Sequence, residues 1–205
     1  MARRTKEDAL ATRDNILDVA EQLFVTQGVS RTTLQHIASA AGVTRGAIYW
    51  HFDDKAALFN AMMERAKMPL ESAMQILADA DLSDPLLALR EYMLSVFRLT
   101  VEDPKARRVF EIATLKLELV DELKAVRDRR MQNQTRWMQL VEGCLKVGIR
   151  QGKIKSALPP HAVALGMWAM VDGLVRTWLL DPEAFSLIKM GKKISDAYLD
   201  SLVAE

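Results

Sequence analysis

The side chains that most often carry out covalent or metal chemistry are few in this sequence and lie far apart. The 205 residues include three histidines, at positions 36, 51 and 161, and one cysteine, Cys144, which has no histidine or acid at motif spacing. No glycine-rich phosphate loop, zinc signature or nucleophile elbow occurs. The sequence therefore predicts neither an enzyme nor a protein that holds a metal or a cofactor. A single cysteine also excludes an intrachain disulfide, which favours a reducing cytoplasm.

A different chemistry is indicated by the charges near the N-terminus. Between Glu21 and Asp53 there is no acidic residue, whereas Arg31, Arg45 and two of the histidines fall in that stretch. A phosphate group would therefore meet no repulsion there. Because the formal net charge of the chain is only +1, any binding of nucleic acid must rest on this local arrangement.

Residues 33–52 have the pattern of a helix-turn-helix unit, in which two short helices meet at a tight turn. Such a unit needs a small residue at the helix contact, a residue that tolerates positive φ in the turn, and apolar anchors on both sides. These positions are filled by Ala38, Gly42, Ile37, Val43 and Ile48. The purpose of the unit is to hold the second helix outward, so that its side chains reach base edges and phosphates.

Several polar residues of this unit are candidates for DNA contact. Arg45 and Tyr49 lie four apart and share one face of the second helix of the unit. Thr44 is a candidate N-cap of that helix, and Thr32 or Thr33 a candidate N-cap of the preceding one, with Gln35 placed for a capping box after Thr32. A glycine inside a helix is costly unless something must approach closely, which is a reason to expect DNA at Gly46.

The helical spacing of apolar residues continues along the chain and predicts an all-α fold of about nine helices. Four helices begin within the first 55 residues, and longer ones follow, with a domain boundary near residues 53–56. The longer segments are expected at 54–80, 85–102, 104–117, 119–150, 161–180 and 183–203. Pro69 should break or bend the first of these segments, because proline inside a helix removes a hydrogen bond. A short basic arm, comprising Arg3, Arg4 and Lys6, precedes the first helix.

The larger C-terminal part is rich in methionine and tryptophan, with eleven and four in the chain, a composition suited to a pocket for varied apolar ligands. Its most apolar segment, 162–180, contains Asp172 and Arg176, which would be costly in lipid, so we expect a buried helix instead of a membrane span. These two charges either form a structural ion pair or face a ligand cavity.

The motif resembles the TetR family of transcriptional regulators, and most closely its multidrug-efflux repressors of the AcrR type. The resemblance is carried by Thr-Leu-Gln-His-Ile-Ala from position 33, by Gly-Val-Thr-Arg-Gly-Ala-Ile-Tyr-Trp-His-Phe-Asp-Asp-Lys from position 42, and more weakly by Val-Asp-Gly-Leu from position 171. It implies a helix-turn-helix DNA-binding domain over 1–55, built from three helices, and a ligand-binding and dimerisation domain over 56–205. The DNA-binding residues that follow are Thr33, Thr44, Arg45, Gly46, Tyr49, Trp50, His51 and Lys55.

The same resemblance implies a cytoplasmic repressor that binds a near-palindromic DNA operator as a homodimer. A small hydrophobic or amphipathic effector would release it, and the regulated operon would encode a multidrug efflux pump. The residues expected at the effector are Phe97, Phe110, Trp137, Trp168, Asp172 and Arg176. The dimer would form through the last two helices, with Leu174, Trp178, Ile194 and Tyr198 in a four-helix bundle. In the alternative, the C-terminal domain only dimerises or binds a protein partner, without a small ligand.

Overall fold

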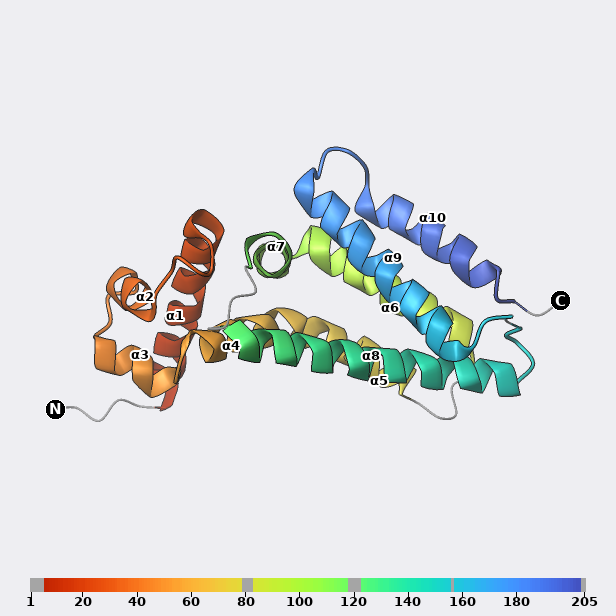
Figure 1. The fold of residues 1–205 in the computed structure, drawn as a ribbon, viewed down its shortest axis with the longest axis horizontal. Coiled ribbons are helices and arrows are strands. Elements are labelled where there is room, and N and C mark those ends of the chain that lie inside the picture. The colour runs from red at the N-terminus through yellow and green to blue at the C-terminus, as the bar shows by residue number, and fades with distance from the viewer. Residues whose placement is uncertain (1–5, 79–82, 118–122, 156, 204–205) are drawn as a thin grey trace. The chain divides into compact units, whose positions relative to one another are not determined.

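The computed structural model describes residues 6–78, 83–117, 123–155 and 157–203. Within these segments the chain forms ten α-helices with short 3-10 and π-helical stretches and no β-strand, which confirms the predicted all-α fold (Figure 1). The helices form two compact units, Met1–Ala66 with Arg108–Arg130, and Lys67–Arg107 with Met131–Glu205. Three helices, α4 (Lys55–Lys67), α7 (Pro104–Glu111) and α8 (Lys124–Arg150), continue from one unit into the other.

The first unit is built on α1 (Lys6–Gln27), α2 (Leu34–Ala40) and α3 (Arg45–His51), followed by most of α4. Its core includes the apolar stripe of the first helix, in which Ile16, Leu17, Ala20 and Phe24 are fully buried. Helix α1 stops before Gly28, whose φ of +81° lies in the region that favours glycine. The helix end predicted at Gly28 is therefore confirmed. The unit also contains the π-helical turn η2 (Ile112–Lys116), which contacts α1.

The second unit contains α5 (Glu71–Leu77), α6 (Pro85–Glu102), most of α8, α9 (Pro160–Leu180) and α10 (Leu187–Asp200). Helix α6 lies at its centre and packs against α5, α9 and α10. Its inner face buries Leu89, Met93 and Phe97 completely. The apolar residues of the segment 85–102 therefore include core positions, and Phe97, which was expected at the effector, is one of them.

Helix ends follow the capping residues of the sequence. Asp84 Oδ1 accepts from Leu87 N at 3.0 Å, and Pro85 occupies the first turn of α6, so the predicted range 85–102 is confirmed. Helix α10 begins later than the predicted residue 183. The carboxylate of Asp181 accepts from Glu183 N at 3.2 Å in a turn, and Ser186 then caps the helix.

The break expected at Pro69 is present, because the 3-10 turn η1 (Met68–Leu70) separates α4 from α5. This turn divides the predicted segment 54–80 into two helices, which raises the number of α-helices from nine to ten. Residues 79–82 and 118–122, at the ends of two predicted segments, lie outside the described residues.

Helix α9 is long and apolar enough to cross a membrane by length and composition, and it is the one such helix in the described segments. It is less buried than the sequence predicted. Its inner side packs against α6 and α10, whereas Leu165, Ala169, Gly173 and Arg176 on its outer side are exposed. A single chain therefore leaves an apolar helix face uncovered.

Candidate nucleic-acid interface and aromatic cluster

The turn between α2 and α3 is stabilised by the residues that the helix-turn-helix pattern requires. Thr33 Oγ1 accepts from His36 N at 3.1 Å and Thr44 Oγ1 accepts from Ala47 N at 3.2 Å, so both threonines are N-caps. Gly42 has a φ of +67°, as expected for the turn. The open choice between Thr32 and Thr33 is thereby resolved. The Thr32 hydroxyl instead donates to Gly28 O at 2.8 Å, so the capping box with Gln35 does not form.

Helix α3 is anchored through its inner face and through the turn before it. Ile48 on α3 and Ile37 and Ala38 on α2 are fully buried, which confirms them as core positions. Asn15 of α1 donates through Nδ2 to Ala41 O at 3.0 Å and so ties the turn to the first helix. The opposite face of α3 is consequently fixed toward solvent.

The outer face of α3 carries the predicted DNA-binding side chains. Arg45, Gly46, Tyr49 and Trp50 are all exposed, and Trp50 is 73% exposed. The Arg45 guanidinium lies 5.7 Å from the centre of the Tyr49 ring, so the two side chains are neighbours as their spacing predicted. Such a contact orients a cation without pairing its charge with a carboxylate. The surface offers a guanidinium, a phenol and an indole together.

Two further features suit the approach of a large partner to α3. A Cβ added at Gly46 would meet no other atom within 4 Å, so nothing inside the protomer requires glycine there. A surface hollow beside the helix is lined by Ala9, Ala47, Trp50 and His51. His51 is half-buried, with its ring 4.6 Å from that of Trp50 in an edge-on contact.

Lys55, which was predicted to bind DNA, is buried inside the first unit. Its side chain is 5% exposed, and Nζ donates to the carbonyl oxygen of Ser30 at 3.2 Å. In this position the ammonium group joins the first turn of α4 to the loop before α2. A lysine that directly follows two aspartates is expected at the surface. The sequence therefore did not predict the burial of Lys55. Of the predicted basic arm, Lys6 is exposed at the start of α1, and Arg3 and Arg4 lie outside the described residues.

A buried carboxylate connects three helices of the first unit. Glu21 of α1 is 2% exposed, and it accepts a hydrogen bond from Nη2 of Arg65 on α4. Arg108 of α7 approaches the other oxygen of the same carboxylate at 3.7 Å. Asp18 also pairs with Arg65, at 2.7 Å. The sequence did not reveal this cluster, because Arg65 is 44 positions away from Glu21.

In the second unit, three aromatic side chains form a cluster on α6, α8 and α9. The ring of Trp137 lies 5.3 Å from that of Trp168 and 6.1 Å from that of Tyr92. Burial of Tyr92 raises its pKa to about 12, and a hydrogen bond with Trp137 acts against this shift. Trp137 and Trp168 were predicted at the effector. Tyr92 was not, although it follows Leu89 by three positions in the apolar stripe of α6.

The other residues predicted at the effector are distributed more widely. Phe97 is fully buried, with its ring against Gly191 of α10. Asp172 is half-buried and Arg176 is exposed, so the two charges have different surroundings. Phe110 is half-buried and belongs to the first unit. Trp178, which was predicted at the dimer interface, is 5% exposed, and the guanidinium of Arg107 lies 4.7 Å from its ring centre.

The predicted dimer residues do not all lie on the outer side of the last two helices. Trp178 is buried within the protomer, and the Tyr198 hydroxyl donates to Val163 O at 3.0 Å. Leu174 is half-buried, whereas Ile194 is exposed. Both sides of these helices carry apolar residues, so spacing alone did not identify the outward side.

A cluster of three or more possible metal ligands was not found in the described part of the chain.

Comparison with known proteins matches both parts of the chain to one family. Residues 16–62 match the family model described as bacterial regulatory proteins, tetR family, and residues 84–204 match the C-terminal region of MAATS-type transcriptional repressors. The transcriptional regulator AcrR of Shigella flexneri is 40% identical over 190 residues, which cover 92% of this chain and 88% of AcrR.

Solved structures show the same relationship in three dimensions. NalD of Pseudomonas aeruginosa superposes with a TM-score of 0.88 at 33% identity, over 97% of this chain and 98% of that one. The complex of SmeT, from Stenotrophomonas maltophilia, with triclosan gives 0.82 at 30% identity, over 95% of this chain and 93% of that one. The resemblance seen in the sequence is thereby confirmed: the chain belongs to the TetR family and is a DNA-binding transcriptional regulator, not an enzyme.

Proposed function

We propose that this chain represses a multidrug efflux operon by binding a near-palindromic operator as a homodimer, and that a small hydrophobic or amphipathic effector releases it. The observation that carries the proposal is the nearly full-length similarity to AcrR and to NalD, whose structure is titled as the secondary repressor of the MexAB-OprM multidrug efflux pump. Because the similarity covers both units, it includes the region that would sense the effector. A protein that acts on an operator works in the cytoplasm.

The DNA contacts are assigned from the outer face of α3. Arg45 is placed to read a base edge in the major groove, since a guanidinium pairs well with guanine. The Tyr49 hydroxyl and the half-buried His51 are placed to bind phosphate oxygens, which fixes the register of the protein on the duplex. Thr33 and Thr44 cap α2 and α3, whose N-terminal amides attract anions. The open surface at Gly46 permits close approach, and the exposed ring of Trp50 provides apolar contact.

Dimerisation is supported by the uncovered apolar sides of α9 and α10. Leu165 is 47% exposed, Met190 40% and Ile194 37%, and small residues at Ala169 and Gly173 continue the same side of α9. Two helices of one protomer that meet the same two helices of another form a four-helix bundle and bury these side chains. We propose a second copy of this chain as the occupant. A two-fold dimer presents two α3 helices and therefore requires two related half-sites.

The effector is assigned to the second unit, near the cluster of Tyr92, Trp137 and Trp168. Flat aromatic walls favour a flat, apolar molecule, and a few polar groups orient it. Asp172 follows Trp168 by one turn on α9 and is half-buried, so we assign it as a polar group that orients the effector. The SmeT complex contains triclosan, so triclosan is a suitable first probe.

Release from DNA requires that the effector prefer a conformation that does not bind the operator. A tenfold loss of operator affinity needs a preference of about 1.4 kcal/mol. We propose that a change in the angle of α4 carries the signal, since α4 begins beside α3 and ends at the 3-10 turn Met68–Leu70. Proline in that turn interrupts the helical hydrogen bonding, so a change of angle is accommodated there.

The test is DNase footprinting on the DNA upstream of the gene for this protein and of its neighbours, with and without triclosan. The proposal expects a protected near-palindrome and loss of protection as triclosan is added. If none of these regions contains a protected site, the proposal is wrong. A protected site that triclosan and other hydrophobic compounds leave unchanged would instead support a C-terminal domain that only dimerises or binds a protein.

A further inference from the structure

Helix α10 has two different sides. Leu187, Gly191, Ser195 and Leu199 recur every four residues on the inner side and are buried. Met190, Ile194 and Ala197 lie on an adjacent side, next to Leu187 in the helical projection, and are exposed. Because one residue turns an α-helix by about 100°, a small rotation of α10 would replace part of its apolar outer side with charged residues. The orientation of α10 therefore determines what a partner molecule meets.

One contact that fixes this orientation is apolar. A Cβ added at Gly191 would lie 2.6 Å from a ring carbon of Phe97 on α6, so the α10 backbone and the ring are in direct contact. Ser195, one turn further on, is also buried, and its hydroxyl lacks a hydrogen-bond partner in the described part of the chain. The middle of the inner side is thus held by packing and not by hydrogen bonds.

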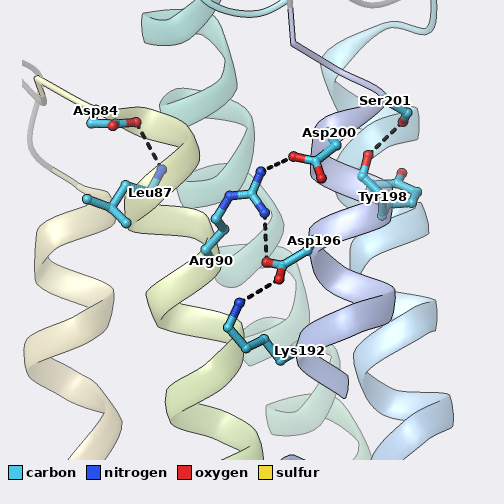
Figure 2. Close-up of polar contacts among 8 residues, drawn as sticks. All are labelled: Asp84, Leu87, Arg90, Lys192, Asp196, Tyr198, Asp200 and Ser201. Atoms are coloured by element: carbon cyan, nitrogen blue, oxygen red, sulfur yellow. Dashed lines mark hydrogen bonds and ion pairs between the residues drawn. The ribbon is translucent and has the colours of Figure 1, made fainter. Parts of the chain in front are cut away.

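A second contact with α6 is ionic and lies two turns away along α6, at Arg90 (Figure 2). Nη1 of Arg90 donates to Asp196 Oδ1 at 2.7 Å, and Nη2 donates to Asp200 Oδ1 at 2.5 Å. The two carboxylates stand one turn apart on α10, so a single planar guanidinium binds two successive turns of the helix. A fork of fixed geometry restricts both rotation and sliding, which a point charge does not.

Lys192 provides an internal comparison. Its Nζ donates to Asp196 Oδ2 at 2.6 Å, but both residues belong to α10. This i, i+4 pair contributes a few tenths of a kcal/mol to the helix itself. It cannot attach α10 to another helix. Of the two cations that bind Asp196, only Arg90 connects α10 to α6.

We infer that Arg90 is a positioning residue for homodimerisation, which holds α10 in the rotation that presents Met190, Ile194 and Ala197 to a second copy of the chain. The inference rests on the proposed homodimer through α9 and α10. Arg90 does not belong to the exposed apolar side of α10. Its loss therefore acts on the dimer through the position of α10, not through a missing intermolecular contact.

The size of the effect follows from the exposure and from symmetry. The side chain of Arg90 is 24% exposed and that of Asp200 is 64% exposed, so the ion pairs are partly screened by water. A partly exposed pair changes an equilibrium by roughly threefold. Because a dimer contains two copies of α10, this factor enters the dimer dissociation constant twice. We expect Arg90→Met to raise that constant by roughly ninefold, which is threefold for each protomer.

The experiment measures the dimer dissociation constant of the full chain by sedimentation at protein concentrations from nanomolar to micromolar. Arg90→Met and Asp200→Asn should both weaken the dimer, and Arg90→Lys should give an intermediate value because an ammonium group satisfies one carboxylate well. Lys192→Met is the matched control, since it removes a partner of Asp196 within α10, and it should change the constant less than about twofold. Urea unfolding of each variant shows whether the fold is retained.

The possible outcomes distinguish the role of Arg90 from the proposed homodimer. A dimeric Arg90→Met protein with unchanged affinity would overturn the role of Arg90 and leave the homodimer intact. If Ile194→Asp fails to weaken the dimer, the proposed interface is wrong, and the role of Arg90 is wrong with it. A wild-type chain that stays monomeric at micromolar concentration would contradict the proposed function itself. If Arg90→Met does not fold, Asp200→Asn decides, because its exposed side chain can be changed without opening the core.

Discussion

Nζ of Lys55 donates a hydrogen bond to the carbonyl oxygen of Ser30 at 3.2 Å, and the lysine side chain is 5% exposed. An ammonium group that is already hydrogen-bonded inside the protein does not neutralise a DNA phosphate. Its contribution to counterion release on DNA binding is therefore small. Lys55→Met should therefore leave the slope of log affinity against log salt unchanged, whereas the loss of a cation that contacts a phosphate flattens it by about 0.9. Fluorescence anisotropy of labelled operator between low and moderate salt measures the slope for the wild-type chain and for the variant. A slope that is flatter by about 0.9 in Lys55→Met would show that its ammonium group reaches a phosphate.

The neighbours Arg45 and Tyr49 should differ in what their loss does to specificity. Arg45→Ala should relax the preference at one base pair of each half-site by about 1–3 kcal/mol. Tyr49→Phe should weaken operator and unrelated DNA equally, by about 1 kcal/mol, because it removes only a hydroxyl. Competition binding with single-base operator variants measures both effects, and Lys146→Ala in the second unit is the control. Equal behaviour of the two variants would contradict the assignment.

Glu21 should contribute to stability far more than an exposed glutamate. Its buried carboxylate binds Arg65 and lies near Arg108, so Glu21→Ala removes the buried partner of Arg65, which keeps its pair with Asp18, and the carboxylate nearest Arg108. We expect a loss of about 2–4 kcal/mol in the free energy of unfolding. Glu64→Ala, which breaks an exposed pair with Arg129, is the control and should cost less than about 1 kcal/mol. Urea unfolding gives both values, and similar losses would show that burial of Glu21 is unimportant.

Effector and operator should weaken each other by the same factor. This reciprocity is a thermodynamic requirement if both bind one molecule and prefer different conformations. Titration calorimetry with triclosan, in the presence and absence of operator DNA, measures the factor. Equal affinities, for a compound that releases DNA at the same concentrations, would refute the mechanism. Asp172→Ala should alter effector affinity and leave operator affinity unchanged without effector, whereas loss of folding or dimerisation would indicate a structural ion pair.

Cys144 should be unreactive in the native protein. Burial, together with the charge of Asp84, raises the pKa of its thiol to about 12, so the thiolate is scarce at pH 8.5. Ellman's reagent should label the native chain slowly and the unfolded chain rapidly. Above about pH 8.5 the unfolded thiol ionises while the native one stays protonated, so this group favours unfolding progressively as pH rises. Rapid labelling of the native chain would contradict the burial.

The sequence predicts most of what depends on local chemistry. The start of α6 follows from Asp84 and Pro85, the start of α3 from Thr44, and the break after α4 from Pro69, because capping and proline effects act within a few residues. The exposed set on α3 follows from helical spacing once the motif is identified. These features need no knowledge of the tertiary structure.

The rest depends on partners that are distant in sequence. Lys55 binds a carbonyl 25 residues away, and Arg90 binds carboxylates 106 and 110 residues away. Spacing shows that such a side chain is polar and on a helix, but not what it faces. The same holds for Trp178 and Tyr198, whose helices are apolar on both sides. Only the tertiary structure shows that Trp178 is buried inside the protomer and that Tyr198 donates a hydrogen bond there.

The four tryptophans are distributed so that the chain carries two separate optical reporters. Trp50 is 73% exposed on α3 in the first unit, whereas Trp137 and Trp178 are each 5% exposed in the second. An indole in water emits at longer wavelength than an indole in an apolar core, so the red edge of the emission spectrum follows Trp50 and the blue edge follows the buried rings. Operator binding should therefore change the red edge and effector binding the blue edge, and one unlabelled sample reports both events.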